Sequence, residues 1–215
     1  MVSILSKILP FNSIQIVGVF LKEDSTEYNL LNINKKGSKV FVKSFSKSNN
    51  FDTLVNGVNS KIPLILVLDG KGVLNKKIDY DNENDVLWTK NLDYNSVHHS
   101  TLKTTDYSFV SFCRKQLAEE ILSKFDFLKV SLVDFFIGSL QVYITAGFLS
   151  TDEIIANETV FKFNQNELDD VTKLKEKVLN NYKIGEDTVS SEYLSLYAAG
   201  LYFLMNENGL SKSES

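Results

Sequence analysis

The segment from Val97 to Phe136 constrains the fold most, because its pattern predicts strand, strand, helix and strand in succession. Tyr107 to Cys113 is a short aromatic and β-branched run, which is typical of a strand. Arg114 to Phe125 then places its apolar residues on one helical stripe, and Val130 to Phe136 returns to strand chemistry. A chain that contains this unit is expected to be an α/β protein with a real hydrophobic core.

The residues before this unit predict an antiparallel meander, a short helix and a central strand. Strand patterns at Ile14–Leu21, Tyr28–Asn34 and Val40–Phe45 follow one another through turns. Asn50 is placed to cap a short helix. The continuous apolar run Leu64–Leu68 is typical of a strand buried on both faces.

The residues after the unit predict a second, smaller meander followed by helices. Strands are expected at Leu140–Ala146, Glu153–Ala156 and Thr159–Phe163, and Asn166 is placed to cap a helix that runs on to Tyr182. A closing helix is expected from about Ser190, in which small residues would let another backbone approach closely.

This order of elements predicts three parts and a tail. Residues 1–78 would form a first half-domain, and residues 79–136 a connecting loop and the strand–strand–helix–strand insert. Residues 137–205 would form the reduced second meander with the closing helices, and residues 206–215 a disordered polar tail.

Charge and cysteine content exclude several classes of protein. The net charge of −4 excludes general nucleic-acid binding, which needs a concentrated basic surface. The single cysteine, Cys113, excludes an internal disulfide, fits a reducing compartment and is expected to be buried. The apolar stretch Val130–Leu149 is interrupted by Asp134 and Gly138, so strands are expected there and not a membrane helix. We therefore expect a cytoplasmic protein.

The motifs predict no catalytic residue, no cofactor and no metal site. Asp69-Gly70-Lys71-Gly72 follows a strand but lacks the spacing of a phosphate loop, so a hairpin turn is favoured. His98 and His99 are neighbours on a strand and would point to opposite faces, which does not suit one metal. The alternating acidic residues between Asp79 and Asp85 lack the glycine of a calcium loop and are expected in a solvated connection.

Two segments resemble a known family. Phe112-Cys113-Arg114-Lys115-Gln116-Leu117, continuing to Val130-Ser131-Leu132-Val133-Asp134, resembles a segment of the type IV pilus assembly protein M. Tyr197-Ala198-Ala199-Gly200-Leu201 resembles the helix that ends the same fold. The cytoplasmic domain of the type II secretion L component shares this architecture. The resemblance implies an actin-like (ribonuclease-H-like) fold with mixed sheets, a β–α–β insert and a reduced second half.

The chain departs from nucleotide-binding members of that superfamily, in which a carboxylate and glycines of the first hairpin hold phosphate and Mg²⁺. Here the hairpin Val19–Glu27 has no glycine, and no second glycine-rich turn follows Gly138. The resemblance therefore implies a degenerate member without enzymatic activity. It would be a cytoplasmic scaffold that docks a secretion or pilus assembly ATPase and inner-membrane partners.

Such a scaffold would lie at the inner face of the inner membrane, through a partner or through a helix beyond Ser215. Trp88, Tyr193 and Tyr197 are the candidate docking residues, because tyrosine and tryptophan are favoured at interfaces. The sequence leaves open whether the chain forms a homodimer. Two other functions stay open as well: a nucleotide-binding actin-like ATPase, and an unrelated protein-interaction domain.

Overall fold

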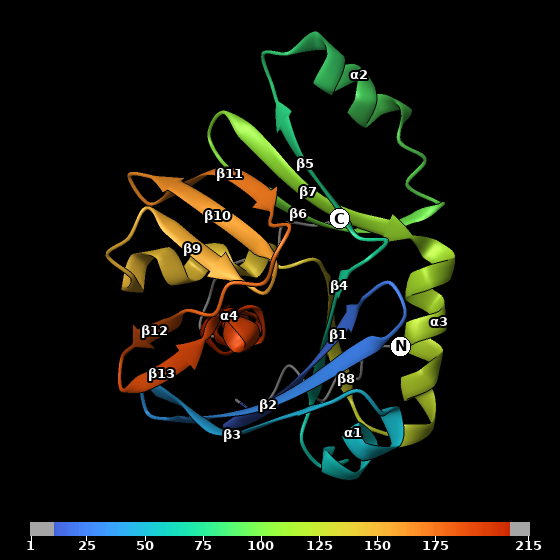
Figure 1. The fold of residues 1–215 in the computed structure, drawn as a ribbon, viewed down its shortest axis with the longest axis vertical. Helices are drawn as coiled ribbons and strands as arrows, with labels where there is room; N and C mark the ends of the chain where they lie inside the picture. The colour runs from blue at the N-terminus through green and yellow to red at the C-terminus, as the bar shows by residue number, and fades with distance from the viewer. Residues whose placement is uncertain (1–10, 207–215) are drawn as a thin grey trace.

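The computed structural model describes residues 11–206, and Figure 1 shows how their elements are arranged. The tail predicted from residue 206 lies outside this range, except for Asn206, the last residue of the closing helix. Within the described range the strands form four sheets. No helix in that range is both long and apolar enough to cross a bilayer.

A five-stranded sheet forms the centre of the molecule, in the order β3-β2-β1-β4-β8. Its strands are β1 (Ser13–Leu21), β2 (Thr26–Lys36), β3 (Lys39–Ser48), β4 (Leu64–Gly70) and β8 (Leu132–Ile137). β1, β4 and β8 are parallel, whereas β2 runs antiparallel to both of its neighbours. The predicted meander and the predicted buried strand are confirmed.

Helices cover both faces of this sheet, so the core has two halves. On one face lie α1 (Phe51–Gly57) and α3 (Lys115–Phe125), with the short 3₁₀ turn η2 (Asp126–Leu128) after α3. α4 (Ser191–Asn206) lies against the other face, where Figure 1 shows it nearly end-on. The two faces explain why β4 is apolar at consecutive positions: Leu64, Leu66 and Leu68 face α3, while Ile65 and Val67 face α4.

The strand–strand–helix–strand unit is confirmed, and its first two strands join a separate sheet in the order β5-β7-β6. The strands are β5 (Leu74–Asp79), β6 (Val97–Lys103) and β7 (Tyr107–Arg114). The acidic connection predicted as a loop contains a helix, α2 (Glu83–Asn91). The side chain of Asn82 caps it, and carboxylates in its first turn favour the helix N-terminus.

The strand predicted at Leu140–Ala146 is wrong, because this segment is a 3₁₀ helix, η3 (Leu140–Phe148). Gly138, at φ 73°, turns the chain out of β8 where an added Cβ would lie 2.5 Å from Ser111 Oγ. Leu140, Gln141 and Val142 are all buried in succession, which a strand with alternating faces does not allow next to a single core.

The helix predicted after Asn166 is also wrong. The chain instead forms the meander β9 (Glu153–Ala156), β10 (Thr159–Asn164) and β11 (Glu167–Lys173), followed by the hairpin β12 (Asn181–Ile184) and β13 (Asp187–Ser190). Gln165 and Asn166 both have positive φ and connect β10 to β11 as a two-residue turn. That turn fixes an antiparallel hairpin where periodicity alone favoured a helix.

Candidate functional site

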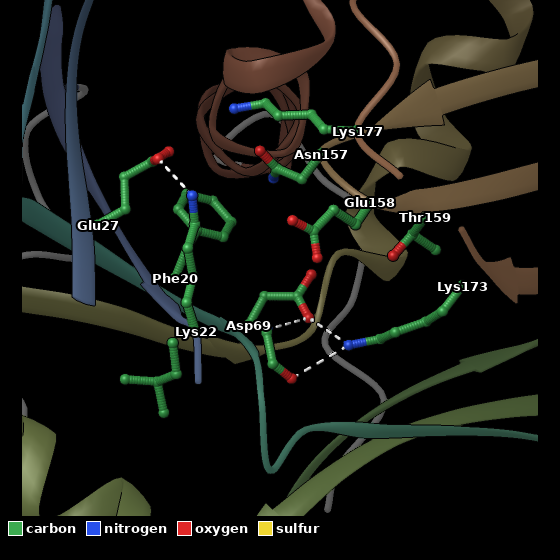
Figure 2. Close-up of a pocket in the computed structure, with 11 residues that line it drawn as sticks. Phe20, Lys22, Glu27, Asp69, Asn157, Glu158, Thr159, Lys173 and Lys177 are labelled. Carbon is green, nitrogen blue, oxygen red and sulfur yellow. Dashed lines mark hydrogen bonds and ion pairs between the residues drawn. The ribbon is translucent and has the colours of Figure 1, made fainter. Parts of the chain in front are cut away.

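The carboxyl ends of three parallel strands define the candidate site. β1 ends at Leu21, β4 ends at Gly70, and β8 is followed by Gly138 and Ser139. Parallel strands present these ends at one edge of the sheet, which is where open α/β sheets bind ligands. Here a cleft separates this edge from the turn between β9 and β10 and from the end of β11. Figure 2 shows its lining.

The cleft is lined mainly by polar and charged side chains that come from both sides. Its lining residues are Phe20, Leu21, Lys22, Glu27, Asp69, Gly70, Asn157, Glu158, Thr159, Lys173 and Lys177. The connection Lys22–Ser25 after β1 and the turn Asn157–Glu158 after β9 contain no glycine, so neither of these two segments has the glycine that close backbone contact with a phosphate favours.

Asp69 is the buried carboxylate of the site, and its side chain is only 4% exposed. The hydroxyl of Ser139 donates to Asp69 Oδ2 at 2.7 Å, and the backbone N–H of Gly70 donates to Oδ1 at 2.7 Å. Lys173 Nζ lies 3.4 Å from the same Oδ1 and donates to the carbonyl of Gly70 at 3.1 Å. The chain itself therefore supplies both the donors and the positive charge that a buried carboxylate needs.

The Asp69-Gly70 sequence is required by this geometry, although the hairpin predicted for it is wrong. β4 and β5 lie in different sheets, so the turn crosses from one sheet to another. Gly70 has φ 98°, and an added Cβ would lie 2.1 Å from the carbonyl oxygen of Leu21. This close contact, together with the hydrogen bond from Lys71 N to Leu21 O at 2.7 Å, fixes the end of β4 against β1.

A chain of alternating charges begins at the cleft and runs on from it. Glu27 lies 3.0 Å from Lys22 and 2.9 Å from Lys47, and Lys47 lies 2.8 Å from Glu192. Lys177 pairs with Glu192 as well. Each lysine that faces the cleft, Lys22, Lys173 or Lys177, is thus paired with a carboxylate of the chain.

These pairs shift the pKa values of the groups in them. Burial by itself raises the pKa of Glu27, but hydrogen bonds from Lys47 and Lys22 outweigh it and hold the pKa below 4.5. Burial lowers the pKa of Lys47, but hydrogen bonds to Glu192 and Glu27 outweigh it and raise the pKa above its usual value. Hydrogen bonds from Lys177 and Lys47 lower the pKa of Glu192. The charged forms are therefore favoured throughout the network.

The structure places the predicted docking residues away from this cleft. Trp88 lies on α2, with its ring 5.5 Å from that of Phe112 and Lys76 Nζ 5.3 Å from its centroid. It packs against the β5-β7-β6 sheet, and its docking role stays a prediction. Tyr193 and Tyr197 are buried in the core beneath the sheet, at 8% and 2% exposure. Their burial gives them a packing role, so docking through them would require α4 to leave the core.

The remaining candidate groups lie on the insert. His98 and His99 point to opposite faces of β6, toward Phe135 and Tyr94 respectively. Cys113 is buried, as predicted, and burial raises the pKa of its thiol to about 11. Among residues 11–206 no group of three or more His, Cys, Asp and Glu side chains could hold a metal ion.

No family model and no curated protein matches this sequence. Solved structures do match. A chain of the PilM-PilN type IV pilus biogenesis complex is 9% identical, with a TM-score of 0.52, and the match covers 77% of this chain and 62% of that chain. This chain has an actin-like fold. The predicted fold class is therefore confirmed. The match spans less than two thirds of the length of the chain from the complex.

A second match among solved structures is the cytoplasmic domain of EpsL, an inner membrane component of the type II secretion system of Vibrio cholerae. It is 11% identical, with a TM-score of 0.46, and the match covers 93% of this chain and 79% of that chain. Within the actin-like fold, the residue that prediction from sequence missed is Asp69. The sequence signal that could have identified Asp69 is its position directly after the apolar run Leu64–Leu68, which is typical of a strand buried on both faces.

Proposed function

We propose that this chain is a non-catalytic scaffold of a secretion or type IV pilus-like assembly platform. The observation that carries the proposal is a cleft closed by the chain's own ion pairs within an actin-like fold. Asp69 is neutralised by Lys173, and the lysines that could meet a phosphate are held by Glu27 and Glu192. A fold that keeps its cleft but fills it in this way is suited to binding other proteins and not to turnover.

The fold similarity supports the assembly role. The matched chain belongs to the PilM-PilN type IV pilus biogenesis complex. By analogy this chain would dock a cytosolic assembly ATPase and inner-membrane platform proteins, and would lie on the cytoplasmic side of the membrane. This step is analogy at the level of the fold, since the identity is 9%.

Trp88 is the candidate docking residue that remains at the surface. It is partly buried against Phe112, and its neighbour Leu87 on α2 is 54% exposed. Tryptophan and exposed leucine on a short helix form an apolar contact of the kind that interface cores use.

The test is affinity purification from a lysate of the source organism with the tagged chain as bait, followed by mass spectrometry. Recovery of an assembly ATPase or of a pilus or secretion inner-membrane protein supports the scaffold. Trp88→Ala should lose that partner, whereas Tyr80→Ala, which removes an exposed aromatic side chain outside α2, should keep it. Recovery of no such protein by a folded bait contradicts the proposal.

The non-catalytic part has its own test. Millimolar ATP with Mg²⁺ should leave the melting temperature of the chain unchanged, because a ligand that binds only the folded state must raise it. A rise of several degrees would instead favour a nucleotide-binding ATPase of the same fold.

A further inference from the structure

β11 is attached at two points to segments on either side of the turn between β4 and β5. At its end, Lys173 reaches Asp69 and the carbonyl of Gly70, at the close of β4. Four residues earlier, Asp169 accepts two hydrogen bonds from Lys77 Nζ of β5: one to its backbone carbonyl at 2.6 Å and one to Oδ1 at 3.1 Å. The two contacts therefore connect the β9–β10–β11 sheet to both of the other large sheets.

The charges at the two points are not equivalent. Asp69 is buried, and Lys173 is the cation paired with it in the described part of the chain. Removing that cation would leave a buried carboxylate with neutral donors only, which is costly. The Lys77–Asp169 pair is more exposed, since the side chains of Lys77 and Asp169 are 32% and 54% exposed. Exposed ion pairs contribute little to the stability of the fold by themselves. Lys77 Nζ also lies 3.7 Å from the centre of the Tyr107 ring, which holds its position.

We propose that β11 is a strap, and that the ammonium group of Lys173 is a built-in cation that holds the cleft closed. It joins the β9–β10–β11 sheet to the carboxyl end of β4 without a bound ligand. A ligand that entered the cleft beside Asp69 would have to displace Lys173 and so release the end of the strap. This inference rests on the proposed function, in that it treats the chain's own charges, and not a nucleotide, as what closes the cleft.

The test is hydrogen–deuterium exchange on the full chain with Lys173→Met, which keeps most of the apolar stem of the side chain and removes its charge. Amides of β11 and of the segment Asp69–Gly72 should both exchange several-fold faster than in the wild type. The matched control is Lys162→Met, on the neighbouring strand β10, where the lysine side chain is exposed and lies away from Asp69, opposite Asp170 and Glu153 in the strand ladder. It should leave exchange unchanged in both segments.

A double-mutant comparison isolates the pair. Asp69→Asn keeps the shape of the side chain and removes its charge: its amide oxygen can still accept from the N–H of Gly70, and its NH2 group can donate to the hydroxyl of Ser139. It should accelerate exchange in the same two segments. The Asp69→Asn/Lys173→Met variant should exchange no faster than the faster of the two single variants, because the interaction is already lost in each. Additive effects would overturn the inference, and so would unchanged exchange in Lys173→Met or acceleration confined to β11.

The failure of the strap is distinguishable from the failure of the proposed function. If the exchange experiments contradict the strap, the predicted recovery of a partner and the predicted absence of stabilisation by ATP are unaffected. Stabilisation of the wild type by ATP and Mg²⁺ would contradict the non-catalytic scaffold even if Lys173 and Asp69 proved coupled.

Discussion

The carboxylate of Glu27 on β2 lies 2.9 Å from the ammonium group of Lys47 on β3, and Lys47 in turn lies 2.8 Å from Glu192 on α4. The side chain of Glu27 is only 6% exposed, although it sits beside the cleft. One chain of charges therefore connects the edge of the central sheet to the first turn of the helix that covers it. Stability should depend on whether its carboxylates are ionised.

Glu27→Gln should lower the free energy of unfolding at pH 7 by about 1–3 kcal/mol, because Lys22 and Lys47 lose their charged acceptor. The pKa of Glu27 in the folded chain lies below 4.5, since the hydrogen bonds from Lys47 and Lys22 outweigh the opposing effect of burial. The stabilisation is therefore complete well above pH 4.5 and is lost as the pH falls through the folded-state value. Urea unfolding at pH 7 and at pH 4 checks this.

The matched control for this prediction is Glu23→Gln. Glu23 pairs with Lys71 and its side chain is 80% exposed, so its loss should change stability little at either pH. An equal loss of stability for Glu27→Gln at both pH values would contradict the assigned role of ionisation.

Gly200→Leu should destabilise the chain by about 1–3 kcal/mol, because it overpacks the contact between α4 and the central sheet. A Cβ added at Gly200 would lie 2.6 Å from Ile33 Cδ1 and 2.9 Å from Ile16 Cδ1. Gly147→Ala is the control, since nothing lies within 4 Å of the added Cβ there and the change should be neutral or slightly stabilising. Thermal unfolding of both variants measures the difference, and equal melting temperatures would contradict the close approach.

The central sheet and its helices could be predicted because their signals are local. The apolar run Leu64–Leu68 indicates a strand with two buried faces, and Asn50 caps α1 as expected, accepting from Thr53 N at 3.0 Å. Gly200 of the closing helix packs closely against the central sheet, but its neighbours are the side chains of Ile33 and Ile16 and not the backbone that was expected. Each of these features follows from a short stretch of sequence.

The second half could not be predicted in the same way, because a turn without a clear sequence signal overrules its helical spacing. Leu168, Val171 and Leu174 have helical spacing, yet the positive φ values of Gln165 and Asn166 direct the chain into a hairpin. The turn lacks the Asn-Gly or Asp-Gly sequence from which a two-residue hairpin turn can be predicted.

The candidate site was missed for a related reason. Asp69-Gly70 reads as a turn, and its role depends on Ser139 and on Lys173, which is 104 residues away in the sequence. No local pattern connects these three residues. The parallel pairing of β4 with β8 brings Ser139 to Asp69, and Lys173 reaches the same carboxylate from the end of β11, in another sheet.

The double substitution Gln165→Asn/Asn166→Gly should raise the free energy of unfolding by about 1 kcal/mol. Both residues have positive φ, at 51° and 68°, where Asn and Gly are strained less than the present residues. The reverse test is Gly185→Ala, in the turn between β12 and β13 at φ 61° with open space around it, which should lose about 1 kcal/mol. Chemical denaturation of both variants measures these changes, and a loss in the double variant would contradict the turn geometry.

Cys113 should react with iodoacetamide at pH 8 at least about 100-fold more slowly in the folded chain than in urea. Burial raises the pKa of its thiol from 9.0 to about 11, and only the thiolate is the nucleophile. Since Cys113 is the one cysteine of the chain, mass spectrometry reads its labelling directly. Ser123→Cys, on the exposed face of α3, is the control and should label nearly as fast in folded as in unfolded protein. Fast labelling of folded wild type would show that β7 opens readily and that its thiol is not held in the core.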